Sequence, residues 1–155
     1  MASLLDFTKP HLAYYSVPAA LLLAFLPSGY KMATAGKHAD TAMPRRVLAN
    51  LEKDPSIDKQ MVLRLQRADA ASANAFETIG LYAGGIAAAG AAGVPASTLN
   101  YLGVGYVASR LVYNVVYVFL QDNRKFAPVR SLVWNVGLGV IVTLWIKAGN
   151  AAAAK

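Results

Sequence analysis

The chain alternates long apolar stretches with shorter polar ones. No charged side chain lies between Lys9 and Lys31, and residues 12–30 supply about the 20 residues that a helix needs to cross a hydrocarbon layer of about 30 Å. Three further apolar stretches follow, so we expect helices at about residues 12–30, 60–92, 99–121 and 128–148. This pattern predicts an all-α fold, an integral membrane four-helix bundle that forms one domain over residues 1–155.

The first apolar stretch also admits a second interpretation, a cleaved signal peptide. Residues 33–35 read Ala-Thr-Ala, a small-residue pattern of the kind that precedes a cleavage site. Asp6 weakens the basic region that should come first, and Lys31 interrupts the approach to the cleavage site. We therefore favour a membrane-spanning helix and keep the signal peptide as the alternative.

A polar stripe interrupts the second apolar stretch. Arg67, Asn74 and Glu77 recur at the spacing of one helical face. A charge near the centre of a bilayer costs about 2.5 to 3.5 kcal/mol, whereas each Leu or Ile recovers only about 0.3 to 0.6 kcal/mol. This face must therefore meet protein or a polar ligand.

The third apolar stretch carries a second polar stripe, formed by Arg110, Tyr113, Asn114, Tyr117 and Gln121. Arg110 lies near the middle of the stretch and needs a partner inside the bundle. Asp69 and Glu77 are the acids within the predicted spans, so we expect an ion pair between Arg110 and Glu77. Such a pair would explain both charges but not the neighbouring tyrosines.

Small and aromatic residues predict how the helices pack. Gly80, Gly84 and Ala88 form a ridge at four-residue spacing, which allows close helix contacts in lipid. The last helix is expected to begin at Pro128, a residue suited to a first turn. Trp134 and Trp145 are expected as anchors at the membrane interface.

Composition and charge narrow the class of protein further. The chain is 56% hydrophobic and only 15% charged, which is typical of a membrane protein. Its net charge of +7 comes from Lys and Arg clustered in two loops, residues 31–66 and 121–127, which we place in the cytoplasm. The basic residues have no interleaved aromatics, so we expect no nucleic-acid partner. Cysteine is absent and the two histidines lack ligand-like spacing, so we expect no metal site.

Three short motifs resemble one known family. The first is Arg67-x3-Ala71-x2-Asn74-x2-Glu77, the second is Arg110-x2-Tyr113-x3-Tyr117, and the third is Ala127-Pro-Val-Arg130-Ser131. Together they resemble the MAPEG superfamily, the membrane-associated proteins in eicosanoid and glutathione metabolism, and they are most similar to its microsomal glutathione transferases. The resemblance implies a homotrimer that binds glutathione between subunits and takes a lipophilic second substrate from the membrane lipids. In a eukaryote it implies the endoplasmic reticulum.

The resemblance also implies roles for individual residues. Asn74 and Glu77 would hold the polar end of glutathione, and Arg67 would anchor a carboxylate or brace the site. Arg110, Tyr113 and Tyr117 match the family's ligands on the third helix, and Arg130 with Ser131 matches the segment that approaches the sulfur. The chain departs from the family pattern at Gln66, Ala70 and Trp134, and it combines features of two branches, so the eicosanoid substrate does not follow.

The chemistry of these residues suits glutathione. The tripeptide is about 10 Å long, and the helix rises about 10.5 Å from Arg110 to Tyr117. Arg67 and Arg110 could meet its two carboxylates, and Glu77 its ammonium group. A free thiol of pKa about 8.5 is only about 3% ionised at pH 7, and a cation such as Arg130 would lower that pKa by about 1 to 3. The other reading of Arg130 is an interfacial arginine that reaches for lipid phosphate.

Three functions therefore remain open from sequence. The first is a glutathione-dependent membrane enzyme, namely a transferase, a peroxidase or a thiol-assisted isomerase acting on a lipophilic electrophile. The second is a non-catalytic trimer that binds and presents lipids, as in the lipoxygenase-activating branch. The third is a family member repurposed for another reaction on a membrane metabolite.

Overall fold

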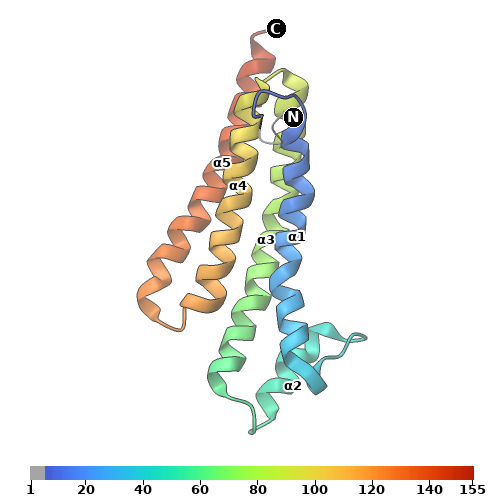
Figure 1. Ribbon diagram of the computed structural model, residues 1–155, viewed down its shortest axis with the longest axis vertical. Helices are drawn as coiled ribbons and strands as arrows, with labels where there is room; N and C mark the ends of the chain where they lie inside the picture. Colours follow the sequence, from blue (N-terminus) through green and yellow to red (C-terminus); the bar gives the residue numbers. More distant parts are fainter. Residues whose placement is uncertain (1–5) are drawn as a thin grey trace.

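The computed structural model describes residues 6–155 as a bundle of helices joined by turns (Figure 1). Its four long helices are α1 (Leu12–Ala35), α3 (Lys59–Ala92), α4 (Ala96–Val115) and α5 (Ala127–Ala153). A π-helical turn, Val116–Leu120, continues α4. The shorter elements are α2 (Val47–Lys53) and the 3-10 turns Gly36–His38, Pro44–Arg46 and Arg124–Phe126.

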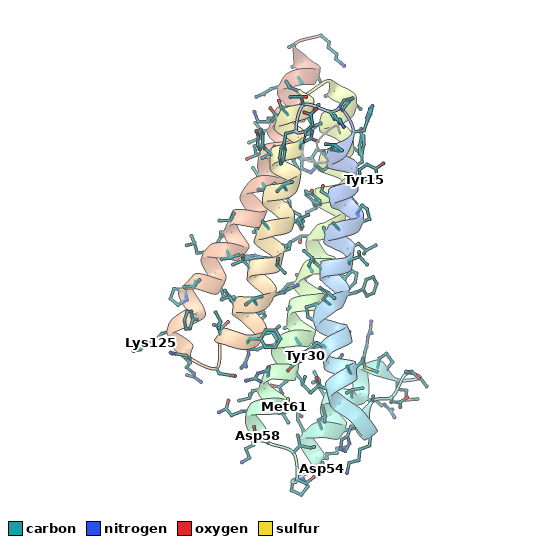
Figure 2. All side chains as sticks on the ribbon, in the orientation of Figure 1. Tyr15, Tyr30, Asp54, Asp58, Met61 and Lys125 are labelled. Carbon is teal, nitrogen blue, oxygen red and sulfur yellow. The ribbon has the colours of Figure 1, made fainter. Side chains whose placement is uncertain are left out.

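The long helices pack as neighbouring pairs (Figure 1). α1 lies against α3 and α4, and α5 lies against α3 and α4. The described N-terminal segment and the C-terminus lie at one end of the bundle, whereas α2 and the α4–α5 loop lie at the other. Figure 2 shows the same division in side chains, with Tyr15 towards one end and Asp54, Asp58 and Lys125 at the other.

Within the described part of the chain, three helical stretches are long and apolar enough to cross a membrane: Leu12–His38, Ala96–Leu120 and Arg124–Ala153. α3 is the exception among the long helices, because charged residues interrupt its apolar sequence, among them Arg64, Arg67, Asp69 and Glu77. The all-helical fold with these apolar helices is that of a membrane protein.

The segment expected to be a polar connection, residues 31–66, contains more structure than a solvated loop. α1 continues to Ala35, and α2 begins at Val47, where Val47 and Leu51 are spaced for one helical face and are both buried. They pack with Val62 and Leu65 of α3 in one apolar cluster. Asp58 caps α3 by accepting a hydrogen bond from the Gln60 N–H at 3.3 Å.

α5 is longer than expected, since it begins at Ala127 and continues to Ala153. The extension is the Ala-rich run after Asn150, and alanine has the highest helix propensity of all residues.

Glycines on α3 allow α5 to approach closely. A Cβ at Gly84 would lie 3.3 Å from the Trp145 ring, and a Cβ at Gly85 would lie 3.1 Å from Leu144. Trp145 also donates a hydrogen bond of 3.0 Å to the Leu81 carbonyl. Of the expected ridge, Gly84 therefore contacts α5 of the same chain, whereas Gly80 faces open space.

Candidate functional site

The two polar stripes meet through a hydrogen bond between α3 and α4. Asn74 Nδ2 donates to the Tyr113 hydroxyl at 2.8 Å. The Tyr113 ring packs against Tyr117, at 5.5 Å between ring centroids, and against Trp134 of α5, at 5.4 Å. Tyr113 is buried, whereas Asn74 and Tyr117 are partly exposed. We name Asn74, Arg110, Tyr113, Tyr117, Arg130 and Trp134 the arginine–tyrosine cluster.

Arg110 lies at the inner end of this cluster and is 4% exposed. Its guanidinium carbon lies 5.4, 5.2 and 5.0 Å from the ring centroids of Tyr106, Tyr113 and Trp134. Its Nη2 donates to the carbonyl oxygens of Val133, at 3.1 Å, and Trp134, at 3.3 Å. Aromatic faces and carbonyl dipoles therefore solvate this cation in place of an acid.

The expected ion pair between Arg110 and Glu77 is wrong. Glu77 is exposed on α3, and within residues 6–155 Arg110 forms no salt bridge. The other acid considered, Asp69, instead binds the buried Lys31 of α1, with 2.5 Å between Nζ and Oδ1. The difference is one of position, because Glu77 is exposed on α3 whereas Arg110 lies among aromatic rings of α4 and α5. Arg110 therefore keeps an unneutralised positive charge inside the bundle.

Arg110 also needs space on α5, and Gly137 provides it. A Cβ at position 137 would overlap the guanidinium, with its Cζ only 2.6 Å away. Gly137 is buried in the middle of α5, where an alanine would otherwise favour the helix. The absence of a side chain at this position makes room for the Arg110 guanidinium between α4 and α5.

The helical spacing predicted that Arg67 would line one polar surface with Asn74 and Glu77, but its guanidinium is bound by a loop carboxylate. It binds Asp122 of the α4–α5 loop, and Arg64 binds the other oxygen of the same carboxylate at 2.5 Å. The hydrogen bond from Arg64, followed by that from Arg67, lowers the pKa of Asp122 from its ordinary value. Arg67 therefore braces the loop, and Arg110 and Arg130 are the arginines that remain in the cluster.

Arg130 and Ser131 lie at the half-exposed edge of the cluster, in the first turns of α5. The Arg130 guanidinium carbon lies 5.0 Å from the centroid of the Tyr117 ring. Its Nη2 lies 3.4 Å from the Ser131 hydroxyl oxygen, which makes a long hydrogen bond. The structure thus brings Arg130, Tyr117, Tyr113 and Asn74 together and leaves Glu77 outside.

Sequence reasoning missed several residues of this site. Trp134 was expected as an interfacial anchor, but its ring packs against both Tyr113 and the Arg110 guanidinium. Tyr106 and Gly137 were overlooked, although Tyr106 is one helical turn before Arg110, a spacing that could have pointed to it. Asp122 was also missed, although it is the sole acid in the basic loop 121–127 and could have been predicted to pair with a nearby arginine.

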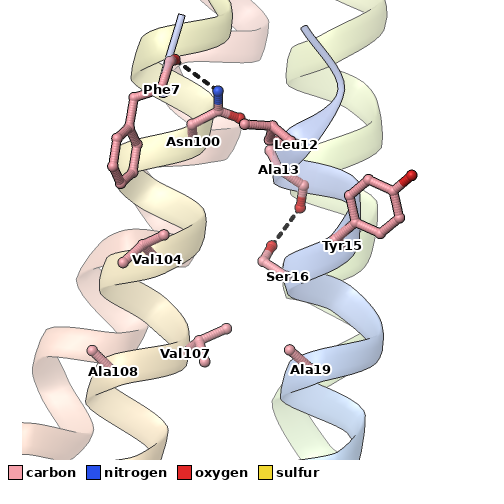
Figure 3. A pocket seen from close by; sticks show the side chains of 10 residues that line it. All are labelled: Phe7, Leu12, Ala13, Tyr15, Ser16, Ala19, Asn100, Val104, Val107 and Ala108. Carbon is pink, nitrogen blue, oxygen red and sulfur yellow. Dashed lines mark hydrogen bonds between the residues drawn. The ribbon is translucent and has the colours of Figure 1, made fainter. Parts of the chain in front are cut away.

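A separate apolar pocket lies between α1 and α4 towards the other end of the bundle (Figure 3). Its volume is about 410 Å³, and apolar side chains of both helices form most of its wall, among them Leu12, Val104 and Val107. Asn100 secures one rim by donating to the carbonyl oxygens of Phe7, at 2.8 Å, and Lys9, at 2.9 Å. Ala13 and Ser16 form the opposite wall, so this pocket contains no member of the arginine–tyrosine cluster.

The fold and the site define a class before any comparison: a helical membrane protein with a buried cationic, tyrosine-lined cluster near one end of its bundle. The family model described as the MAPEG family matches residues 12–150. The chain therefore belongs to the MAPEG family. No match was found among curated proteins or among solved structures.

Proposed function

We propose that this protein is a glutathione-dependent membrane enzyme that acts on a lipophilic electrophile. The observation that carries the proposal is the buried charge of Arg110, which has aromatic rings and carbonyls around it and, among residues 6–155, no acid paired with it. A buried unpaired cation is costly, and an anionic ligand offsets that cost. The MAPEG family includes glutathione transferases and peroxidases as well as non-catalytic members.

The residues present fit glutathione at its anionic groups. Arg110 is the cation available to a carboxylate from inside the bundle, and the Tyr117 hydroxyl and the Asn74 amide lie on the half-exposed side where a peptide would pass. Glu77 is exposed one turn further along α3 and could meet the ammonium group. Arg67 is already paired with the Asp122 carboxylate, so its proposed role is to brace the site rather than to bind a carboxylate of glutathione.

Arg130 is the residue we assign to the thiol. A guanidinium within hydrogen-bonding distance of a thiol lowers the pKa of that thiol by about 1 to 3, and the positive end of the α5 helix dipole also favours an anion. Arg130 would hold the sulfur as a thiolate once its proton has passed to solvent, and the Ser131 hydroxyl would supply a further hydrogen-bond donor. Bound glutathione would supply this thiolate, which could form a carbon–sulfur bond to an electrophilic carbon as a leaving group departs with the bonding electrons. With a peroxide it would be oxidised to a sulfenic acid as the O–O bond breaks and an alcohol leaves, and a second glutathione would convert the sulfenic acid to the disulfide and water.

The assembly and the location follow from the same proposal. We infer a homotrimer in which glutathione lies between subunits, because Glu77 faces outward from a single subunit. The basic loops 31–66 and 121–127 would face the cytoplasm, and in a eukaryote the membrane would be that of the endoplasmic reticulum. The lipophilic substrate would enter from the bilayer.

A second candidate function is a non-catalytic, lipid-binding trimer of the lipoxygenase-activating type. The apolar pocket of about 410 Å³ between α1 and α4 favours it, because its size is that of a small-molecule site. A member repurposed for another reaction on a membrane metabolite would share the same pocket.

Calorimetry of the detergent-solubilised protein tests the proposed function. We expect glutathione to bind, and we expect Arg110→Met to weaken binding about tenfold or more, since a hydrogen bond to a charged group contributes about 1.5 to 3 kcal/mol. Lys147→Met is the matched control, because it removes an exposed charge from α5. Absence of glutathione binding would refute the proposal, and binding without consumption of any electrophile or peroxide would favour the second candidate.

A further inference from the structure

A single acidic side chain ties the α4–α5 loop to α3. Asp122 accepts hydrogen bonds from Arg64, with 2.5 Å between Nη2 and Oδ2, and from Arg67 through Oδ1. Because each arginine binds a different oxygen, the orientation of the carboxylate is fixed as well as its position. The side chain of Arg67 is only 15% exposed, so this part of the contact is partly shielded from water.

Arg67 also contacts the end of α4. Its Nη2 lies 3.5 Å from the Val118 carbonyl oxygen, within the π-helical turn Val116–Leu120. This turn carries Tyr117, and π turns are frequent at functional sites. One arginine of α3 thus joins the acid of the loop to the turn that orients Tyr117.

The loop leads from Asp122 into α5 through tight turns. Asn123 Oδ1 accepts a hydrogen bond of 3.0 Å from the Lys125 N–H, and the Phe126 N–H donates to the Asn123 carbonyl at 3.1 Å. Pro128 then restricts the backbone of the first turn of α5. A displacement of Asp122 is therefore passed to the start of α5, where Arg130 lies 5.0 Å from the Tyr117 ring.

We propose that Asp122 is a positioning residue for Arg130. By holding Arg64 and Arg67, it fixes the start of α5 against the π-helical turn, so that Arg130 stays beside Tyr117 and the bound thiol. This inference rests on the proposed function in assigning the thiol to Arg130. Asp122 itself touches neither the thiol nor the electrophile.

A purely structural ion pair makes a different prediction. Exposed salt bridges contribute little to stability, and their loss leaves the chemistry of a distant group unchanged. The position of the α5 start and the pKa of the bound thiol are therefore the two readouts that separate a positioning role from a structural one.

The first experiment measures the position of α5 without any ligand. The natural chain has no cysteine, so Lys59→Cys on α3 and Val129→Cys on α5 can be spin-labelled specifically. We expect Asp122→Asn to broaden or shift the distance distribution between the labels. Asp40→Asn is the matched control, because it also removes one loop carboxylate charge and its amide oxygen can still accept the N–H bonds of Ala42 and Met43. An unchanged distribution in Asp122→Asn would overturn the inference.

The second experiment titrates the thiol of bound glutathione by its thiolate absorbance. We expect Asp122→Asn to raise that pKa by about 1 with little change in glutathione affinity, and Asp122→Glu to restore it. An unchanged thiol pKa in folded Asp122→Asn protein would also overturn the inference. If the unsubstituted protein binds no glutathione, the proposed function fails, and the label distances alone then decide whether Asp122 holds the loop.

Discussion

The side-chain amide of Asn74 on α3 donates a hydrogen bond of 2.8 Å to the hydroxyl of Tyr113 on α4. Tyr113 is 2% exposed, whereas Asn74 is partly exposed. The bond therefore links the buried interior of the arginine–tyrosine cluster to its open side. It also fixes the direction of the Asn74 amide, and hence the hydrogen-bonding groups that a ligand would meet.

Removing this hydrogen bond should loosen the site without unfolding the bundle. Tyr113→Phe keeps the ring contacts with Tyr117 and Trp134 but frees the Asn74 amide, at a cost of about 0.5 to 1.5 kcal/mol. We expect the dissociation constant for glutathione to rise about two- to tenfold. Tyr101→Phe is the control, because the Tyr101 ring is 64% exposed and stacks on Phe7 outside the cluster. Equal calorimetric affinities for all three proteins would contradict the role of the bond.

Two glycines of α5 offer a matched test of the place of Arg110. Gly137→Ala puts a methyl group into the guanidinium, so we expect a loss of about 1 to 3 kcal/mol in unfolding free energy and weaker glutathione binding. Gly139→Ala meets nothing within 4 Å and should leave stability equal or raise it by up to about 1 kcal/mol. Thermal melting and calorimetry of both variants measure this difference. Equal melting temperatures and equal glutathione affinities in the two variants would contradict the close contact between Gly137 and Arg110.

The buried Lys31 should depend on Asp69. Lys31 is 4% exposed, and its Nζ lies 2.5 Å from Asp69 Oδ1. Asp69→Ala leaves a buried ammonium without its partner, so we expect a stability loss of about 1 to 3 kcal/mol. The double variant Lys31→Met with Asp69→Leu should recover most of it, because methionine fills the buried position of Lys31 without a charge. Melting temperatures in one detergent test this, and a double variant as unstable as Asp69→Ala would count against the pairing.

Acid should loosen the loop between α1 and α3. Hydrogen bonds from the Ser56 hydroxyl, and then from the Ser56 N–H, lower the pKa of Asp54 from 3.8 to about 2, and Lys37 adds to the effect. A depressed folded-state pKa means that the contribution to stability is complete above pH 3.8 and is lost as the pH falls towards about 2. Asp54 also binds His38, with 3.0 Å between Oδ2 and Nε2.

Limited proteolysis of residues 36–58 between pH 5 and pH 2, with an acid-stable protease, measures this loosening. We expect cleavage to increase towards the acid end in the natural chain. Asp54→Asn should already be cleaved readily at the upper end and should respond less to acid. A variant whose pH profile matches that of the natural chain would show that Asp54 does not hold the loop.

Much of the fold could be predicted because hydrophobic length and helix signals act locally. The uncharged run after Lys9 and the turn residue Pro128 mark where α1 and α5 lie, and Gly93, at φ +88°, ends α3 where a left-handed residue is required. The structure of residues 31–58 was underestimated, because its charged residues concealed the two buried positions of α2. The burial of Lys31 was also not predicted, because its partner Asp69 lies far away in sequence.

The sequence could predict most of the residues that form the candidate site, but not which of them bind each other. Helical spacing places Asn74 and Tyr113 on inward faces, but only the packed helices show that they bind each other. Arg110 was expected to seek an acid, and the structure gives it aromatic rings, because several rings together can solvate a guanidinium. Arg67 was expected to bind the ligand, but in the structure it forms a salt bridge with the loop carboxylate of Asp122. Both outcomes depend on residues distant in sequence.

The pKa of the glutathione thiol, measured on the protein by thiolate absorbance, tests the central claim most directly. The claim is that Arg130 keeps the sulfur negative beside Tyr117. We expect the bound thiol of the natural chain to ionise well below its solution pKa of about 8.5, and we expect Arg130→Leu to return it to that value with affinity largely kept. Arg124→Leu, which removes an exposed arginine from the preceding turn, should leave it unchanged. A bound thiol that titrates like free glutathione in the natural chain, or that is indifferent to Arg130→Leu, would contradict the account.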